Sequence, residues 1–420
     1  MAGRHGYRLG SGGAATDYTI GLADYDRLRK ERLAKAQAYM KKHKMAAALL
    51  FKTYNIRYVT STKFQMPLDF VERVNYCLAF AEHPPILFTH HGNPSGDCPW
   101  IKPEQRRVAF HWAQQAAGRD ATDATTRKFA ASIKEELKQK GLEGEKLGID
   151  DIDEAGRQAL VDAGLELENA MPVMLEARAV KTQDEINLVH MAAVNADAVH
   201  YAMYEFIKPG VRERDIKAVA YNYLYRAGSE PWGISIRSGG VVGGSLIDSD
   251  RIIQPGDVVT IDVTRCPYMG YYTCYYRNYL VGRKPTEKEK DMHKRCYEMV
   301  YRALDAIKPG VTTADTAKFW KTAKEAGHPS EEWVWDDDVA HGIGLTLYEY
   351  PISNRLWSFD YPQVYEKGMT IAVEAQVFDP MIGRLKLEEE VVVTDDGVEI
   401  LTRMPVKDMM ICAEINIAEC

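Results

Sequence analysis

Two glutamates near the C-terminal end of the chain stand inside apolar runs with strand character. Glu374 lies in the run 369–378 and Glu388 in the run 383–394. A carboxylate in the middle of an apolar strand is costly unless something pairs with it, and a metal ion or a catalytic role is the usual compensation. The alternative for Glu388 is an edge strand whose acids face water. We expect the two runs to pair as strands, with Glu374 as a general acid/base whose pKa burial can raise.

Two further residues extend this set. His341 begins the segment HGIGL, and Asp262 ends the strand-like segment VVTID. A lone histidine before a glycine is more often structural, but carboxylates together with one imidazole suit a Mn, Fe, Co or Zn ion. The sequence therefore predicts two alternatives. Either one divalent metal ion is held by Asp262, His341, Glu374 and Glu388, or the site is metal-free and His341 shuttles protons.

Composition limits the classes of function. The 420 residues are 46% hydrophobic and 27% charged, and the net charge is −7, all typical of a globular protein. The sequence contains no block of Lys and Arg that would indicate a nucleic-acid partner. No apolar run approaches the roughly 18 residues of a membrane helix. The first residues lack the apolar core of a secretory signal, and the seven cysteines include no C-x-x-C pair. We expect a cytoplasmic protein that acts on a small molecule, without a membrane partner.

The order of apolar and amphipathic segments predicts an arm and two domains. Residues 1–21 form the N-terminal arm. Residues 22–172 alternate strands and helices, which is typical of an α/β domain. Within this domain we expect a strand at 55–60 and a helix at 123–140 whose first residue is the N-cap. Residues 173–420 form the second domain, which carries the candidate site.

An internal repeat organises the second domain. The segment IKPGV occurs at 207–211 and again at 307–311. Each copy is expected to form a helix, a Pro-Gly turn and a second helix. The first of these helices should begin at the capping box formed by Thr182 and Glu185. Two copies are too few for a solenoid, so we expect a domain of two related halves with the site between them.

The ordered set Asp262, His341, Glu374 and Glu388, together with the repeat, resembles the pita-bread superfamily of methionine aminopeptidase, prolidase, aminopeptidase P and creatinase. The resemblance covers about residues 178–403 and extends more loosely over an N-terminal domain of the creatinase/prolidase type. It implies an α/β (α+β) fold with a C-terminal pita-bread domain. It also implies a homodimer in which the N-terminal domain of one chain lies near the site of the other.

Several positions depart from the family's pattern. The family has a second metal-binding Asp on the first hairpin, and Cys274 stands at that position. Cys274 could be a metal ligand, a nucleophile or a small core residue. Tyr348 stands where the peptidases have a histidine, Tyr276 where creatinase has its catalytic Glu, and Thr264 where the dimethylsulfoniopropionate lyases have an Asp. These departures indicate a non-peptidase branch near creatinase and the lyases.

The residues expected to bind the substrate come from both domains. Arg73 aligns with the Arg that binds the substrate carboxylate in creatinase, and a guanidinium fork suits a carboxylate. The hairpin 268–279 is rich in tyrosine, and we expect Tyr271, Tyr276 and Trp232 to form an aromatic wall that attracts a cation. Core packing is the alternative for most of these rings. A small zwitterion would satisfy both features.

The sequence thus predicts a hydrolase of a C–N bond in a small carboxylate-bearing metabolite, with Glu374 and His341 as its catalytic residues. Three alternatives remain. The first is a lyase that cleaves an onium acid, the second is a peptidase like aminopeptidase P or prolidase, and the third is a binding module without catalysis. Retention of His341, Glu374 and Glu388 together argues against the third, because a binding module has no need of them.

Overall fold

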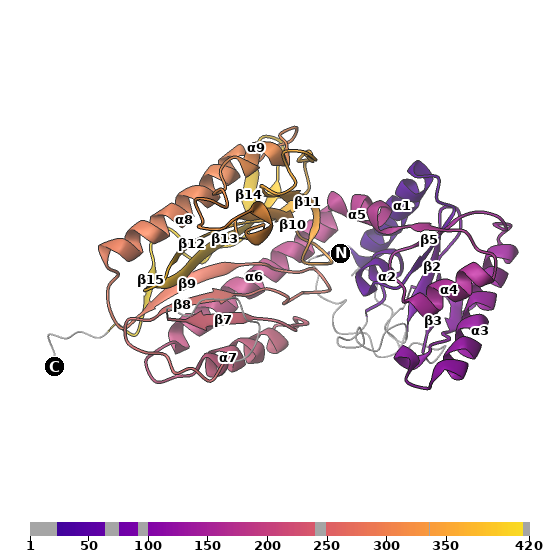
Figure 1. The fold of residues 1–420 in the computed structure, drawn as a ribbon, viewed down its shortest axis with the longest axis horizontal. Coiled ribbons are helices and arrows are strands. Elements are labelled where there is room, and N and C mark those ends of the chain that lie inside the picture. The colour runs from indigo at the N-terminus through magenta and orange to yellow at the C-terminus, as the bar shows by residue number, and fades with distance from the viewer. Residues whose placement is uncertain (1–22, 64–74, 91–99, 240–248, 336, 415–420) are drawn as a thin grey trace, which may run out of the picture. The chain divides into compact units, whose positions relative to one another are not determined.

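The computed structural model describes residues 23–63, 75–90, 100–239, 249–335 and 337–414 (Figure 1). The chain divides into two compact units, Met1–Arg178 and Ala179–Cys420. The division falls at the end of helix α5 (Met171–Ala179), a few residues beyond the domain boundary expected from the sequence. The expected N-terminal arm lies outside the described residues. Among the residues described, no helix is long and apolar enough to cross a membrane.

A six-stranded mixed sheet forms the core of the first unit. In sheet order its strands are β4 (Arg106–Val108), β3 (Ile86–Thr89), β2 (Tyr76–Phe80), β1 (Ala47–Leu50), β5 (Leu147–Ile149) and β6 (Leu167–Asn169). β1 pairs antiparallel with β2 and parallel with β5. The helices that alternate with these strands, as the α/β pattern predicts, are α1 (Tyr25–Lys42), α2 (Thr53–Thr60), α3 (Arg119–Gln139) and α4 (Glu154–Asp162).

Two local predictions for this unit are wrong. Residues 55–60, predicted as a strand, lie in helix α2. The carboxylate of Asp150 accepts hydrogen bonds from the Phe51 and Lys52 amides (2.7 and 3.1 Å) at the start of this helix. An acid from a distant part of the chain thus accepts backbone amides that have no local partner. This tertiary contact outweighs the preference of the β-branched residues in this segment for a strand. The helix predicted at 123–140 is present as α3, but it begins at Arg119 with Gly118 as its N-cap, so the prediction of Asp123 as the N-cap is wrong.

The described part of the second unit contains two sheets and the four α-helices α6 to α9. The first sheet contains β11 (Glu349–Ser353), β10 (Val339–Gly342), β12 (Thr370–Asp379), β13 (Gly383–Val393) and β14 (Val398–Ile400). The second contains β15 (Met410–Cys412), β9 (Tyr276–Val281), β8 (Val258–Asp262) and β7 (Ser235–Ser238). The helices are α6 (Gln183–Phe206), α7 (Glu213–Arg226), α8 (Glu287–Ala306) and α9 (Thr313–Ala317). The two runs that carry Glu374 and Glu388 pair as β12 and β13, as predicted.

The sequence repeat forms the same turn twice. Gly210 and Gly310 have φ angles of 93° and 87°, in the left-handed region that favours glycine. The Gly210 amide donates to the Ile253 carbonyl (2.9 Å), and the Gly310 amide donates to the Tyr365 carbonyl (3.0 Å). The first copy continues into α7, of 14 residues, whereas the second continues only into α9, of 5 residues. The capping box predicted at Thr182 is present at the start of α6.

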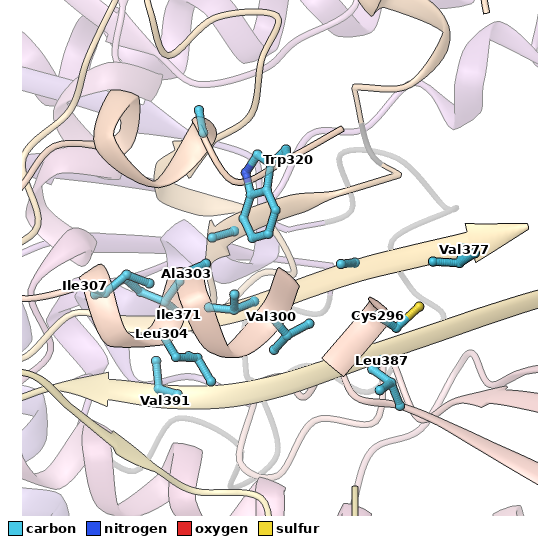
Figure 2. Close-up of a cluster of buried hydrophobic side chains, with 14 of the residues drawn as sticks. Cys296, Val300, Ala303, Leu304, Ile307, Trp320, Ile371, Val377, Leu387 and Val391 are labelled. Atoms are coloured by element: carbon cyan, nitrogen blue, oxygen red, sulfur yellow. The ribbon is translucent and has the colours of Figure 1, made fainter. Parts of the chain in front are cut away.

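Strand alternation gives β12 and β13 one packing face and one polar face. Successive side chains of a strand point to opposite sides of the sheet. The odd-numbered residues Ile371 and Val377 of β12 and Leu387 of β13 are buried in the same cluster as the α8 side chains. Figure 2 shows Val300 and Leu304 of α8 lying over these two strands. The even-numbered acids therefore face away from α8, and the core and the candidate site share the same two strands.

Candidate functional site

Three neighbouring strands bring His341, Glu374 and Glu388 together. Glu374 on β12 lies directly opposite Glu388 on β13. His341 on β10 lies opposite Ala372, which is two residues before Glu374 on the same strand. Residues opposite each other in an antiparallel pair share a face, and so do residues two apart on one strand. All three side chains therefore project from one face of the sheet.

The second sheet adds Asp262 and Cys274 to this group. Asp262 ends β8 and lies opposite Tyr276 on β9, two residues after Cys274. The side chain of Asn278 on β9 joins the two sheets. It donates to the Lys386 carbonyl (3.0 Å) and accepts from the Lys386 amide (3.1 Å). This amide bridge fixes the β9 residues beside the polar face of β13.

Cys274, His341 and Glu388 form a group that could hold a metal ion. One ligand atom of each lies within 4.8 Å of the others, and all three residues are buried. His341 Nε2 and Glu388 Oε1 are 3.8 Å apart. Within the described part of the chain, His341 Nε2 and both carboxylate oxygens of Glu388 lack a hydrogen-bond partner. Buried polar atoms are normally hydrogen-bonded, so a cation that these atoms share explains why they converge without partners.

The protonation of these groups fits the same explanation. Burial lowers the pKa of His341 to about 4, so its imidazole is neutral near pH 7. Its Nδ1 lies 3.1 Å from the Gly342 carbonyl, which can only accept, so the proton resides on Nδ1 and the Nε2 lone pair faces Glu388. Burial and the neighbouring charges of Glu374 and Asp262 raise the pKa of Glu388 well above its usual range. Burial and the Glu388 charge likewise raise the pKa of the Cys274 thiol. A bound cation would reverse both shifts.

A lysine that the sequence reasoning missed compensates Glu374. Lys386 Nζ lies 2.9 Å from Glu374 Oε2, and the two side chains are only 6% and 4% exposed. The ammonium also lies 4.8 Å from the centre of the Tyr276 ring. The nearby carboxylates of Glu374 and Glu388 raise the pKa of Lys386 in spite of its burial, so the ammonium stays charged. The spacing in the sequence could have predicted this position, because Lys386 is two residues before Glu388 and therefore lies on the same face of the strand.

Asp262 is an acid of the group whose pKa lies near neutrality. Burial raises the pKa of this carboxyl to about 6, although Lys386 and the Tyr276 hydroxyl act in the opposite direction. Burial also raises the pKa of Tyr276 well above its usual value, so that phenol remains a donor. A carboxyl with a pKa near 6 can both take up and release a proton at neutral pH.

The three consecutive acids of β13 have different roles, and the water-facing alternative is wrong because Glu388, Glu389 and Glu390 are all buried. Glu389 points to the α8 side and pairs with Arg277 (2.8 Å). A carboxylate oxygen of Glu390 accepts the backbone amide of Cys274. Glu390 thus holds the Cys274 backbone in place, and Glu388 is the member that reaches the candidate metal site.

A cavity of about 360 Å³ lies near this group, although none of the group's acids, nor Cys274 or His341, lines it. Tyr276 lines it beside Arg237 of β7 and Arg384 of β13, which is two residues before Lys386. Neither guanidinium has an ion-pair partner among the described residues, and the buried Arg237 Nε has no hydrogen-bond partner there. Burial and the charge of Arg384 lower the pKa of Arg237. Although Asp337 also lines the cavity, these two uncompensated cations suit a small anion.

The structure places the expected substrate-binding residues differently. Arg73 lies outside the described residues. Tyr271 is buried and donates its hydroxyl to Glu185 (3.0 Å), which indicates a structural contact and not a wall of the cavity. Trp232 is 44% exposed and donates from its indole to the hydroxyl of Tyr272 (3.0 Å). Tyr276 alone among the expected aromatic residues lines the described cavity.

A second aromatic group lies beside His341. The Tyr348 ring is 4.4 Å from the His341 ring, and Trp335 lies 6.2 Å from Tyr348 and 5.5 Å from Trp357. Tyr348 and Trp357 are 36% and 42% exposed, so faces of this group reach the surface. Exposed aromatic faces attract cations. The structure therefore offers a cation-binding wall at His341 as well as a cationic cavity at Tyr276.

The glycines of the HGIGL segment are required by close packing. A Cβ atom on Gly342 would lie 2.3 Å from the Tyr350 carbonyl oxygen. A Cβ on Gly344 would lie 2.6 Å from Glu349 Oε2, which forms a buried ion pair with Lys181 (2.8 Å). These contacts let the chain next to His341 pass close to β11, so the two glycines position the histidine.

Two parts of the chain match known protein families. Residues 32–180 match the creatinase/prolidase N-terminal domain, and residues 187–395 match metallopeptidase family M24. The Xaa-Pro dipeptidase of Pyrococcus furiosus is 30% identical over 235 residues, which are 55% of this chain and 65% of the dipeptidase. The alignment thus spans slightly less than two thirds of that relative's length.

Two further comparisons extend over most of the chain. Dimethylsulfoniopropionate lyase DddP of Roseobacter denitrificans is 24% identical over 409 residues, which are 92% of this chain and 88% of the lyase. The structure of an Xaa-Pro dipeptidase from Bacillus anthracis superposes with a TM-score of 0.71 at 23% identity, covering 91% of this chain and 99% of that one. The expected fold class, with a creatinase/prolidase-type domain before a pita-bread domain, is confirmed.

Proposed function

Because the chain joins an N-terminal domain of the creatinase/prolidase type to a C-terminal domain of metallopeptidase family M24, we propose that it is an enzyme that hydrolyses a C–N bond in a small, carboxylate-bearing molecule. The observation that carries this proposal is the cavity of about 360 Å³, where Arg237 and Arg384 form no salt bridge with a described residue and Tyr276, which lies opposite Asp262, forms part of the wall. The volume suits a molecule of metabolite size. A carboxylate between the two guanidinium groups would direct the rest of the substrate toward Tyr276.

Cys274, His341 and Glu388 would hold the metal ion of this site. Sulfur, nitrogen and oxygen ligands in one set favour Zn, Fe or Co over Mn, which prefers oxygen ligands alone. When bound, such an ion polarises a carbonyl and lowers the pKa of water. His341 contributes its unprotonated Nε2, and the Nδ1 hydrogen bond to Gly342 fixes that tautomer.

Glu374 and Asp262 would divide the proton transfers between them. Glu374 is held by Lys386 at 2.9 Å, and the ammonium favours its ionised form, which can accept a proton from water. Asp262, with a pKa raised to about 6 by burial, is partly protonated near neutrality and can return a proton to the leaving nitrogen. Two carboxylates in different environments thus supply a base and an acid.

The decisive test is to measure which bond is broken and whether water enters the product. The purified protein would be incubated in ¹⁸O-labelled water with small guanidino, amido and onium carboxylates and with dipeptides that end in proline. Hydrolysis of a non-peptide acid with ¹⁸O in the product supports the proposal. Turnover of the dipeptides alone would replace it with a peptidase function, which the likeness to Xaa-Pro dipeptidases favours.

A lyase is the second candidate, and one feature of the site favours it. The aromatic group of Tyr348, Trp335 and Trp357 beside His341 suits an onium cation, and dimethylsulfoniopropionate lyase DddP aligns with 92% of this chain. A lyase would release its product without oxygen from water. Cleavage of an onium acid without ¹⁸O incorporation would establish this function and reject the hydrolase.

A further inference from the structure

The buried carboxylates of the site are compensated in two different ways. Glu374 has a partner in the protein, because Lys386 Nζ lies 2.9 Å from its Oε2. Glu388 forms no salt bridge with Lys386, and the only donor that faces its carboxylate among the described residues is the Cys274 thiol. The two acids lie directly opposite each other on β12 and β13. One side of the acid pair is therefore already occupied by a positive charge and the other is open.

Asp262 belongs to the occupied side. It lies opposite Tyr276 at the end of β8, and the Tyr276 ring is in contact with the Lys386 ammonium at 4.8 Å. The group that can hold a metal contains Cys274, His341 and Glu388, and neither Asp262 nor Glu374 belongs to it. The candidate ligands thus separate into a set next to the ammonium and a set that forms no salt bridge with it.

We propose that Lys386 serves as a built-in cation that takes the place of a second metal ion, so that the site binds one metal ion through Cys274, His341 and Glu388. The Lys386 ammonium is covalently attached to the chain, so it neutralises the charge of Glu374 and Asp262 without any exchange of ligands. A second divalent ion at Glu374 and Asp262 would have to displace this ammonium, whose side chain is only 6% exposed. Repulsion between the ammonium and that ion would therefore prevent binding.

This inference rests on the metal site proposed above, but it does not depend on the substrate. Metal content is measured without turnover, so failure of the inference and failure of the proposed reaction are distinguishable. The full-length protein would be stripped with a chelator, dialysed against Co(II) or Zn(II), and analysed for metal per chain. Co(II) adds a second readout, because a thiolate ligand produces a sulfur-to-cobalt charge-transfer band.

The wild-type protein is expected to bind one Co(II) per chain and to show the thiolate band. Lys386→Gln, which removes the charge but keeps a polar side chain, should raise the stoichiometry from one to two, since Glu374 and Asp262 become free to bind. Asp262→Asn is the matched variant that keeps Lys386. It should leave one ion per chain and the thiolate band unchanged, whereas Glu388→Gln should abolish binding.

Four results would overturn the inference. These are two ions or none in the wild type, one ion in a folded Lys386→Gln variant, loss of the ion in Asp262→Asn, and absence of the thiolate band. If Lys386→Gln does not fold, the contrast between Asp262→Asn and Glu388→Gln decides. A metal ion that Asp262 does not bind should remain in Asp262→Asn and be lost in Glu388→Gln.

Discussion

Removal of Lys386 should destabilise the metal-free protein strongly. In the variant Lys386→Met, the carboxylate of Glu374 loses an ammonium at 2.9 Å while it remains 4% exposed. Breaking a buried ion pair by removing one partner costs about 3–5 kcal/mol, because an uncompensated charge is left behind. Glu388 lies directly opposite Glu374 and offers no compensating positive charge, so we expect a loss within that range. Replacement of Glu374 by Gln in the same chain should recover much of the loss.

The free energy of unfolding would be measured by urea titration of chelator-treated protein. Two probes are needed, circular dichroism and tryptophan fluorescence, since the two units need not unfold together. The matched control is Lys288→Met, because Lys288 forms a surface pair with Asp379 at 2.5 Å and is 60% exposed. This control should lose less than about 1 kcal/mol.

Two results would refute the reasoning about Lys386. A loss below about 1 kcal/mol for Lys386→Met would show that Glu374 does not depend on the ammonium. Strict additivity in the double variant with Glu374→Gln would show the same, because residues in one ion pair should couple by about 0.5–3 kcal/mol.

Three further predictions concern the acids, the cavity and the histidine segment. Burial raises the folded-state pKa of Asp262 from 3.8 to about 6, so its contribution to stability falls as the pH rises through this window. The free energy of unfolding of Asp262→Asn should therefore rise by about 3 kcal/mol relative to that of the wild type between pH 3 and pH 8. Urea titrations at several pH values measure this change, and a difference that stays constant with pH would contradict the prediction. Arg384→Gln should raise the KM for an acid substrate roughly tenfold or more with little change in kcat, because it removes a charge-assisted hydrogen bond. The control is Arg295→Gln at the same cavity, which should change KM little because Arg295 is already near Asp291. Gly342→Ala should lower both thermal stability and metal content, since its Cβ would lie 2.3 Å from a backbone oxygen, and an unchanged melting temperature would refute that packing argument.

The strands of the site could be predicted because their alternation is written in the sequence. In β12 and β13 the apolar odd-numbered positions bury against α8, and the even-numbered positions carry the acids. The same alternation held the information on Lys386 and Arg384, which precede Glu388 by two and four residues. The prediction from the sequence considered only the acids of these strands.

The failed predictions depend on contacts that the local sequence does not contain. Helix α2 forms where β-branched residues favour a strand, because Asp150 from a distant part of the chain accepts the amides at its start. Tyr271 was expected to face the substrate, but its hydroxyl binds Glu185 of the capping box at α6. Both outcomes depend on where a second segment lies in space, which spacing along one segment cannot show.

The distribution of cations among the buried acids explains why Glu388, and not its neighbours on β12 and β13, is the metal-binding carboxylate in our proposal. In the second unit, Glu349 pairs with Lys181, Glu389 with Arg277 and Glu374 with Lys386, at 2.8, 2.8 and 2.9 Å. A buried acid with its own cation is electrostatically complete and holds the structure together. Glu388 forms no salt bridge with Lys386, whose charge acts on it from a longer distance, and His341 Nε2, which is neutral, lies 3.8 Å from its carboxylate. Because Glu388 is also the acid that converges with Cys274 and His341, it has a place for a charge that comes from outside the chain.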